Sequence, residues 1–141
     1  MIFTAPNCES LEYIDFSGID TSNVTDMEEL LSGCASLQEI DFSQLDTSSV
    51  TNMNGLIAGC ESLEEVDLSP LDTSKVTDMG TMLSGLSVET IDLSPLDTSN
   101  VVNMNSLFSY CSSLRRIDLS PLDTFNVVDM SQMFNWCKAL E

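Results

Sequence analysis

Histidine is absent from this sequence, and basic residues are scarce. The lack of histidine removes the side chain that most often acts as a general base or as a ligand of transition metals. Only 4 Lys and Arg stand against 23 Asp and Glu, which gives a formal net charge of -19. Such a surface repels phosphate backbones and anionic lipids, so binding to nucleic acids or membranes is not expected. We predict that the protein is not an enzyme. The negative charge leaves cationic partners and divalent ions as candidate ligands.

Long hydrophobic runs are missing as well. No stretch of about 18 apolar residues occurs that would span a membrane, and residues 1–6 lack the basic region and apolar core of a secretion signal. With 141 residues, of which 43% are hydrophobic, the chain is long enough to bury a continuous core. We expect a single domain over residues 1–141, with any export signal outside this chain.

The dominant feature that is present is an eight-residue phrase, DTSNVTDM, at residues 20–27. Copies begin at Asp20, Asp46, Asp72, Asp97 and Asp123, in steps of 26, 26, 25 and 26 residues. A fixed period of this length is typical of repeat proteins rather than of a single globular core. The whole unit reads C-x-S-L-E-x-I-D-L-S-x-L-D-T-S-x-V-T-D-M-x-x-L-F-x-G and accounts for all but the first few residues.

A short strand is predicted in the first part of each repeat. Leu11, Ile14 and Phe16 have LxxLxL spacing, and alternation places Tyr13 and Asp15 on the face opposite Ile14 and Phe16. The same spacing recurs at residues 37–42, 63–68, 88–93 and 114–119. Stacked in register, one strand per repeat would form a parallel sheet.

A short helix of about two turns is predicted to follow each strand. Val24, Met27, Leu30 and Leu31 fall at helical spacing, and an equivalent apolar set occurs in every repeat. The glycines at positions 33, 59 and 85 suit a left-handed helix exit, although Tyr110 and Trp136 take that place later in the chain.

The combination of LxxIxLS with LDTSxVTxM resembles the repeat of about 26 residues in bacterial surface proteins and surface lipoproteins, a relative of leucine-rich repeats. The resemblance covers residues 8–141. It implies a right-handed α/β solenoid with one short parallel strand and one short helix per turn, located extracellularly or at the cell surface and used for adhesion. Aliphatic residues replace the asparagine that ordinary leucine-rich repeats place after the strand, and we expect the Asp-Thr-Ser corner to take over its role.

Five cysteines share one position of the repeat. They are Cys8, Cys34, Cys60, Cys111 and Cys137, and the missing member of the series is Leu86. A position that accepts leucine is a core position, which favours buried free thiols. Because stacked neighbours would approach disulfide distance, oxidation between adjacent turns is the alternative.

Two columns of aspartates are expected along the stack. The outward strand face carries Asp15, Asp41, Asp67, Asp92 and Asp118. In a parallel ladder these carboxylates would lie about 4.8 Å apart and repel one another. Serine hydroxyls two residues on, protonation, or bridging Ca²⁺ would compensate. We favour the serine network and predict no cofactor, with Ca²⁺ as the alternative. The second column opens the repeated phrase and is expected to form Asx-type turns.

The candidate binding face is the outward surface of the predicted strands. At one position of the repeat on this surface the residue type differs from copy to copy, while the positions on either side keep theirs. The residues at this position are Tyr13, Glu39, Glu65, Thr90 and Arg116. In curved solenoids this surface commonly binds the partner, although drift at exposed positions would produce the same variation. Together with the first aspartate column, these residues form the predicted site.

The predicted function is a non-enzymatic extracellular binding or adhesion module that presents an acidic strand face to a protein or glycan. The alternative is a structural subunit that assembles head to tail into a fibre through uncapped ends. In that alternative, residues 137–141, the first five of another unit, dock onto the Cys8 edge of the next copy. In both hypotheses the chain can be a segment of a longer series of the same repeats.

Overall fold

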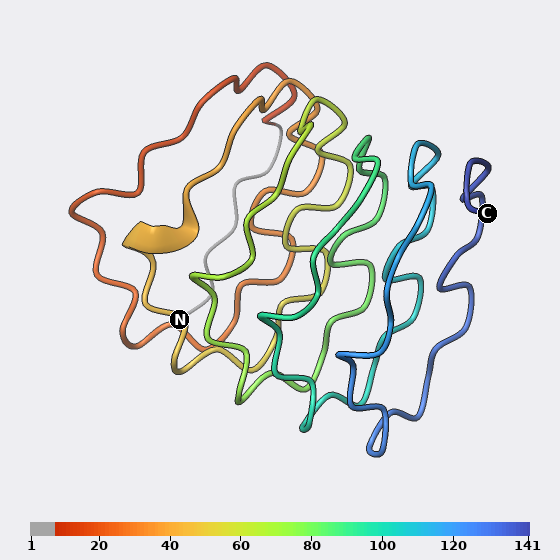
Figure 1. Cartoon of the computed structure of the whole chain (residues 1–141). Helices are drawn as coiled ribbons and strands as arrows, with labels where there is room; N and C mark the ends of the chain where they lie inside the picture. The colour runs from red at the N-terminus through yellow and green to blue at the C-terminus, as the bar shows by residue number, and fades with distance from the viewer. Residues whose placement is uncertain (1–7) are drawn as a thin grey trace.

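The computed structural model describes residues 8–141, which wind through a series of similar turns stacked side by side (Figure 1). Within this part of the chain, the one helical element is η1, a 3-10 helix over Phe42–Gln44. The only β-pairing of the described residues is a row of isolated parallel bridges, Asp26 to Asn52, Asn52 to Asp78, Asp78 to Asn103 and Asn103 to Asp129. None of the described helices is long and apolar enough to cross a membrane.

The predicted α/β solenoid with a strand and a helix in every turn is therefore wrong. In the segment predicted as the first helix, the N–H groups of Met27, Glu29 and Leu31 do not donate within a helix. They donate to the carbonyl oxygens of Asn52, Asn54 and Leu56 in the next repeat, at 2.9, 2.8 and 2.9 Å. The backbone of this segment thus bonds sideways, from turn to turn, every second residue.

Tight local turns account for the helical spacing of the apolar residues. Between the sideways bonds, the Leu30 N–H donates to the Met27 carbonyl and the Cys34 N–H to the Leu31 carbonyl, each at 3.2 Å. Glu29 and Gly33 adopt the left-handed conformation, with φ of 54° and 76°. A left-handed residue interrupts the right-handed backbone conformation that an α-helix needs, so no helix forms. The turns closed by bonds between residues three apart still place the apolar side chains on the core side.

The segments predicted as strands pair only sparsely. Bonds between turns in this half of the repeat run from the N–H of Gln38 to the carbonyl of Glu12 at 3.2 Å, from Arg115 to Glu89 at 3.0 Å and from Glu141 to Arg115 at 3.1 Å. Isolated bonds of this kind do not make a sheet. The parallel connection between repeats lies instead in the half that carries the repeated phrase.

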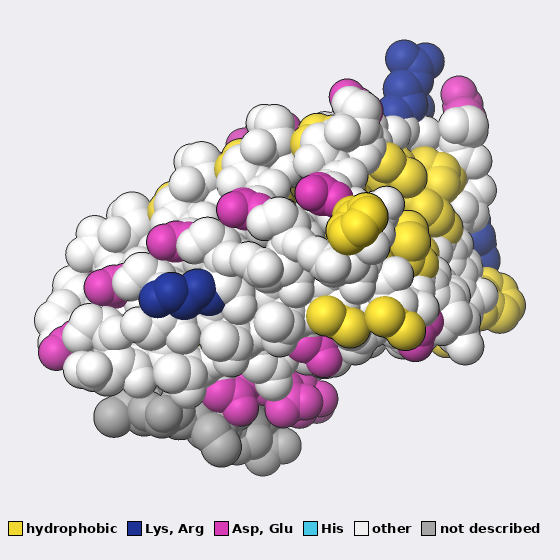
Figure 2. All heavy atoms as spheres, turned by 90° about the horizontal axis from the view of Figure 1, so that it is seen from below, with side chains coloured by type: hydrophobic (Ala, Val, Ile, Leu, Met, Phe, Trp, Pro, Cys, Tyr) yellow, Lys and Arg dark blue, Asp and Glu magenta, His cyan; other side chains and the backbone are white. Residues whose placement is uncertain are grey.

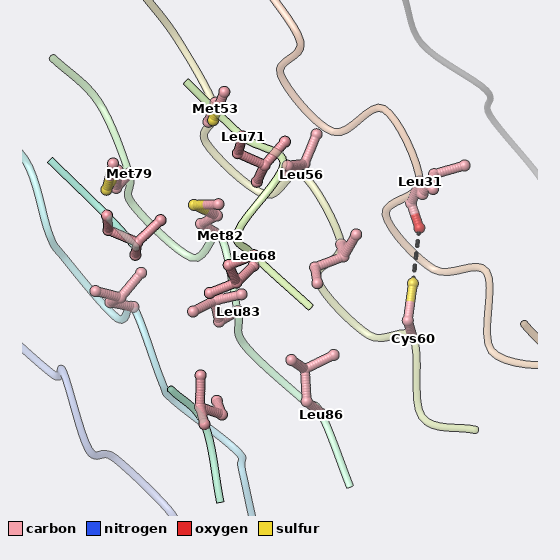
Figure 3. Packing of buried hydrophobic residues seen from close by; sticks show 14 of the residues in the cluster. Leu31, Met53, Leu56, Cys60, Leu68, Leu71, Met79, Met82, Leu83 and Leu86 are labelled. Carbon is pink, nitrogen blue, oxygen red and sulfur yellow. Dashed lines mark hydrogen bonds between the residues drawn. The ribbon is translucent and has the colours of Figure 1, made fainter. Parts of the chain in front are cut away.

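The predicted inward positions do form the core. Val24, Met27, Leu30 and Leu31 are buried, and the equivalent residues of the following turns join them in one hydrophobic cluster, except Met130 in the last turn, which is exposed. Leucine and methionine side chains from several turns point toward a shared interior (Figure 3). Apolar burial between turns is the main favourable term in folding such a stack.

A row of buried threonines joins the corners of successive turns. The Thr21 hydroxyl donates to the Asp46 carbonyl and accepts from the Asp46 N–H. The same two bonds link Thr47 with Asp72, Thr73 with Asp97, and Thr98 with Asp123. The Asp-Thr-Ser corner thus supplies the hydrogen bonds between turns that we expected from it.

The cysteine column contains both of the predicted states. Cys8 and Cys34 form a disulfide between the first two turns, with their Cα atoms 4.7 Å apart. Cys60 and Cys111 are free and buried, and Cys137 is free and half-buried. The buried-thiol prediction is right for the middle of the column, and the oxidised alternative is right at its first pair.

Candidate functional site

The predicted binding face is hollowed into what we call the acidic trough. Its first part is a hollow of about 890 Å³ that spans successive turns. Further hollows share Glu64 with it and extend it along the stack. The residues that line the trough are mostly polar and comprise Glu12, Tyr13, Gln38, Glu39, Ile40, Glu61, Ser62, Glu64, Glu65, Val66, Asp67, Ser87, Glu89, Thr90 and Asp92.

Most of the variable residues predicted for the site line this trough. Tyr13 and Glu39 border its first hollow, and Glu65 and Thr90 border the second. Arg116 is exposed on the equivalent segment of a later turn and is not among the lining residues. The structure thus brings four of the five positions to one continuous surface.

The predicted aspartate column is only partly in the trough. Asp67 and Asp92 line its hollows. Asp15, Asp41 and Asp118 are exposed but are not lining residues. The carboxylates of the trough are therefore supplied mainly by glutamate.

Several of these glutamates were not predicted for the site. Glu12, Glu64 and Glu89 stand one residue before the variable positions, ahead of the half of each segment to which the alternation was applied. All three are exposed, because the chain there is not a regular strand. The sequence feature that could have revealed these glutamates is the pair of mostly polar residues between the first Leu and the Ile of the unit. Two such residues in a row indicate that both side chains face solvent.

Each aspartate of the first column is bound by its own serine. The Ser17 N–H donates to Asp15 Oδ1 at 2.8 Å, and the Ser17 hydroxyl donates to Asp15 Oδ2 at 3.0 Å. Hydrogen bonds from Ser43 and Ser69 hold the pKa of Asp41 and of Asp67 below the usual range. The expected serine network therefore operates within each turn, and its hydrogen bonds favour the charged form of each carboxylate.

The aspartates of the second column, which begin each copy of the repeated phrase, also accept hydrogen bonds from the residue two positions on. The Ser22 N–H and hydroxyl both donate to Asp20 Oδ1, at 3.0 and 2.6 Å, and lower the pKa of Asp20. The neighbouring carboxylates of Asp20 and Asp72 act on Asp46 in the opposite direction, but the Ser48 bonds outweigh them and its pKa is still lowered. These are the Asx-type turns that were predicted.

A third polar column alternates carboxylates with amides. It consists of Asp26, Asn52, Asp78, Asn103 and Asp129, the residues of the parallel bridges. The side-chain amides of Asn54 and Asn103 both donate to Asp78 Oδ1, at 3.1 and 3.0 Å. Placing an amide between successive aspartates separates like charges along the stack and provides donors to the carboxylate.

An aromatic pair borders a further hollow beside the trough. Tyr110 and Trp136, from adjacent turns, stack with ring centroids 6.4 Å apart, and the Lys138 ammonium lies 5.2 Å from the Trp136 ring centre. This hollow shares Glu61 with the first part of the trough. Glutamates and exposed aromatic rings therefore occur along one continuous surface.

The arrangement is suited to holding cationic groups, through carboxylates and through aromatic faces. Among the described residues, no group of three or more Cys, Asp or Glu side chains is placed to hold a metal ion. Figure 2 shows acidic side chains spaced along another face of the stack, with hydrophobic side chains gathered toward its C-terminal end.

A family model described as "Mycoplasma protein of unknown function, DUF285" matches residues 1–90 and again residues 66–141. The two matches together span the chain, and they overlap as expected when one model fits successive repeats. No curated protein and no solved structure matches significantly. The match agrees with a bacterial repeat family in broad terms, whereas the closer kinship to leucine-rich repeats is not supported.

Proposed function

We propose, from the premise that the chain belongs to the family described as Mycoplasma protein of unknown function, DUF285, that it is a non-enzymatic binding module. Its acidic trough holds a basic segment of a protein partner at the bacterial surface. The disulfide between Cys8 and Cys34 supports an oxidising location outside the cytoplasm. The observation that carries the proposal is the concentration of glutamates along one hollow.

Six glutamates line the trough, and no lining residue of its three hollows is basic. They are Glu12, Glu39, Glu61, Glu64, Glu65 and Glu89. A hollow lined by one sign of charge concentrates the field, which raises the association rate of an oppositely charged partner. The buried Leu37 and Leu63 anchor the backbone beside these residues, and the Gln38 N–H donates to the Glu12 carbonyl of the preceding turn at 3.2 Å. Part of the site is therefore held in place before binding, which reduces the free energy a partner would lose in ordering it.

The aromatic pair favours a lysine-rich or arginine-rich peptide over a glycan. The Lys138 ammonium lies 5.2 Å from the Trp136 ring centre, and this contact within the chain supports the binding of cationic side chains at the aromatic pair. A sugar would need exposed ring faces with neutral hydrogen-bonding groups, whereas half of the residues that line the first hollow of the trough are glutamates. A basic polypeptide satisfies both the carboxylates and the rings.

The test is titration of a fluorescent lysine-rich peptide into the purified chain. We expect a double variant, Glu39→Lys with Glu64→Lys, to weaken binding about tenfold or more, because it reverses two charges inside the trough. The matched control reverses Glu28 and Glu9, which are exposed outside the trough. Equal weakening by both pairs would mean that net charge alone attracts the peptide and would overturn the proposal. Binding of neutral glycans, but not of peptide, would do the same.

End-to-end assembly is the second candidate, because the turn over residues 123–141 exposes groups that earlier turns cover. Met130 is 42% exposed, whereas its equivalent Met104 is fully buried. Phe125 and Val128 are 91% and 84% exposed. Within residues 8–141, the Met130 N–H has no partner, whereas the Met104 N–H donates to Asp129 at 2.8 Å. An edge of this kind can pair with another copy.

Sizing at high protein concentration, together with electron microscopy, tests the second candidate. We expect concentration-dependent oligomers or filaments that a Val128→Asp substitution disperses, because a buried unpaired charge is costly. The control is Val102→Asp, which places the same charge at the equivalent valine of the preceding, internal turn, where the side chain is also exposed. A monodisperse monomer at every concentration would rule out assembly through this edge.

A further inference from the structure

A second pair of cysteines, at the other end of the cysteine column, has the same spacing as the disulfide-bonded Cys8 and Cys34 but is not bonded. Cys8 and Cys34 are separated by 26 residues, one turn of the stack. Cys111 and Cys137 are separated by the same number, since 137 minus 111 is 26. Both are free thiols in the structure.

The two turns that carry Cys111 and Cys137 are held in register immediately beside them. The N–H groups of Phe108 and Tyr110 donate to the carbonyls of Met133 and Asn135 at 3.0 and 2.7 Å. Phe108 also stacks on Phe134, with ring centroids 5.5 Å apart. Residues on the N-terminal side of each cysteine are therefore paired across the two turns.

The cysteines themselves have matching local geometry. The Cys111 N–H donates to the Phe108 carbonyl and the Cys137 N–H to the Phe134 carbonyl, both at 3.2 Å, as Cys34 does to Leu31. The Cys137 sulfur reaches back to the preceding turn, where it donates to the Phe108 carbonyl oxygen at 3.0 Å. It therefore lies beside the segment that leads directly into Cys111.

We propose that Cys111 and Cys137 are the site of a second intramolecular disulfide, which joins the turns beside the aromatic pair. This inference does not depend on the proposed binding function. Cys60 is excluded from an equivalent bond, because Cys34 on one side is already bridged and Leu86 occupies the place on the other. The Cys60 and Cys111 sulfurs donate to the preceding turn as Cys137 does, to the carbonyls of Leu31 (Figure 3) and Leu83. What distinguishes Cys111 and Cys137 is a free cysteine in the adjacent turn.

A small-molecule disulfide such as oxidised glutathione is the oxidant for this bond. The half-buried Cys137 loses its proton and attacks one glutathione sulfur, which forms a mixed disulfide and releases one glutathione thiol. Cys111 then loses its proton and attacks the Cys137 sulfur, which releases the second thiol. Two electrons and two protons pass from the cysteines to glutathione disulfide.

Burial determines the order of these steps. It raises the pKa of Cys111 to about 11 and that of Cys137 in the same direction. Cys111 is buried, so an external oxidant meets Cys137 first. The second step needs no external access, because both sulfurs belong to adjacent turns of one chain.

Trypsin separates the two cysteines and makes the bond directly observable. Its cleavage sites are Lys75, Arg115, Arg116 and Lys138, so Cys111 falls in the peptide 76–115 and Cys137 in the peptide 117–138. The protein is incubated with oxidised glutathione, alkylated under denaturing conditions, digested and analysed without reduction. We expect these two peptides to be linked, with the link lost on reduction and Cys60 alkylated.

Separate alkylation of Cys111 and Cys137 after this treatment would overturn the proposal, as would a covalent dimer through Cys137. A Cys137→Ser variant, which retains the Cys8 and Cys34 disulfide, controls for other effects of the oxidant. Oxidation should raise the melting midpoint of the unsubstituted chain by about 5 °C and leave that of the variant unchanged. Equal shifts in both would contradict a bond at this site.

Discussion

Thr21 binds both backbone groups of Asp46 in the adjacent turn. Its hydroxyl accepts a hydrogen bond from the Asp46 N–H at 2.8 Å and donates one to the Asp46 carbonyl oxygen at 3.0 Å. Thr21 is only 2% exposed, so these bonds are shielded from water. One hydroxyl thus satisfies two polar groups that the stacking of turns would otherwise bury without partners.

Replacing a threonine of this row should show its contribution to stability. We expect Thr47→Val to lower the free energy of unfolding by about 2 to 4 kcal/mol, because the N–H and carbonyl of Asp72 would both lose their partner. Thr47→Ser should retain most of the stability. The matched control is Thr124→Val, since Thr124 is exposed at the last corner. Urea denaturation measures the difference, and equal costs at positions 47 and 124 would contradict this role.

Gly80 is required for close packing beside Asp78. A methyl group at this position would lie 2.7 Å from the Asn54 amide nitrogen and 2.9 Å from that of Asn103, and both amides donate to Asp78. We expect Gly80→Ala to cost about 1 to 3 kcal/mol of unfolding free energy. In an Asn54→Ala background the additional cost should shrink, because the nearest clash is gone. A double-mutant cycle by chemical denaturation checks this, and additive costs would refute the clash.

Acid should destabilise the fold by protonating the serine-bound aspartates. Ser74 lowers the pKa of Asp72 through its hydroxyl and its N–H, so this carboxylate stabilises the folded state above the ordinary aspartate pKa. The stabilisation is lost as the pH falls through the lowered pKa, below about 4. Thermal melts between neutral pH and about pH 2.5 should show a falling midpoint.

The serine dependence can be measured at one residue. Ser74→Ala should move the pKa of Asp72 back toward its ordinary value, because the hydroxyl is lost while the backbone N–H remains. Carbon-detected NMR titration of the Asp72 carboxyl group gives this value directly. An unchanged pKa would show that the hydroxyl does not control it.

Calcium should leave the stability of the chain unchanged. Each aspartate of the first column turns toward the serine two residues on, as Asp41 and Asp67 do toward Ser43 and Ser69. Their oxygens are not gathered into the six to eight ligands that Ca²⁺ takes. Melting curves with millimolar Ca²⁺ and with a chelator should coincide, and a higher midpoint in Ca²⁺ would restore the bridging alternative.

The repeat length, the inward residues and the Asx-type corners could all be predicted from the sequence. The type of backbone structure could not, because apolar residues at i, i+3 and i+4 fit both a helix and a chain of tight turns. Left-handed residues decide between them, and Glu29 and Thr81 are left-handed, with φ of 54° and 50°. Neither glutamate nor threonine signals that conformation, since glycine is the residue that adopts it without cost.

The residues of the binding face that were chosen because they vary from repeat to repeat were mostly predicted correctly. The residues whose exposure depends on the backbone conformation were not. Tyr13, Glu39, Glu65 and Thr90 do line the trough. Glu61 and Glu64 were not expected there. The prediction applied alternation only to the second half of each strand segment, and both of these glutamates precede that half.

The sequence by itself determined the period, the charge, the content of the core and the capping of aspartate by serine, because each depends on residue type and spacing. Only the tertiary structure decided which backbone groups bond to which, and therefore that turns rather than strands and helices carry the stack. The physical reason is that a donor such as the Met27 N–H has acceptors both within its own turn and in the next. The choice between them is made only when neighbouring turns pack together.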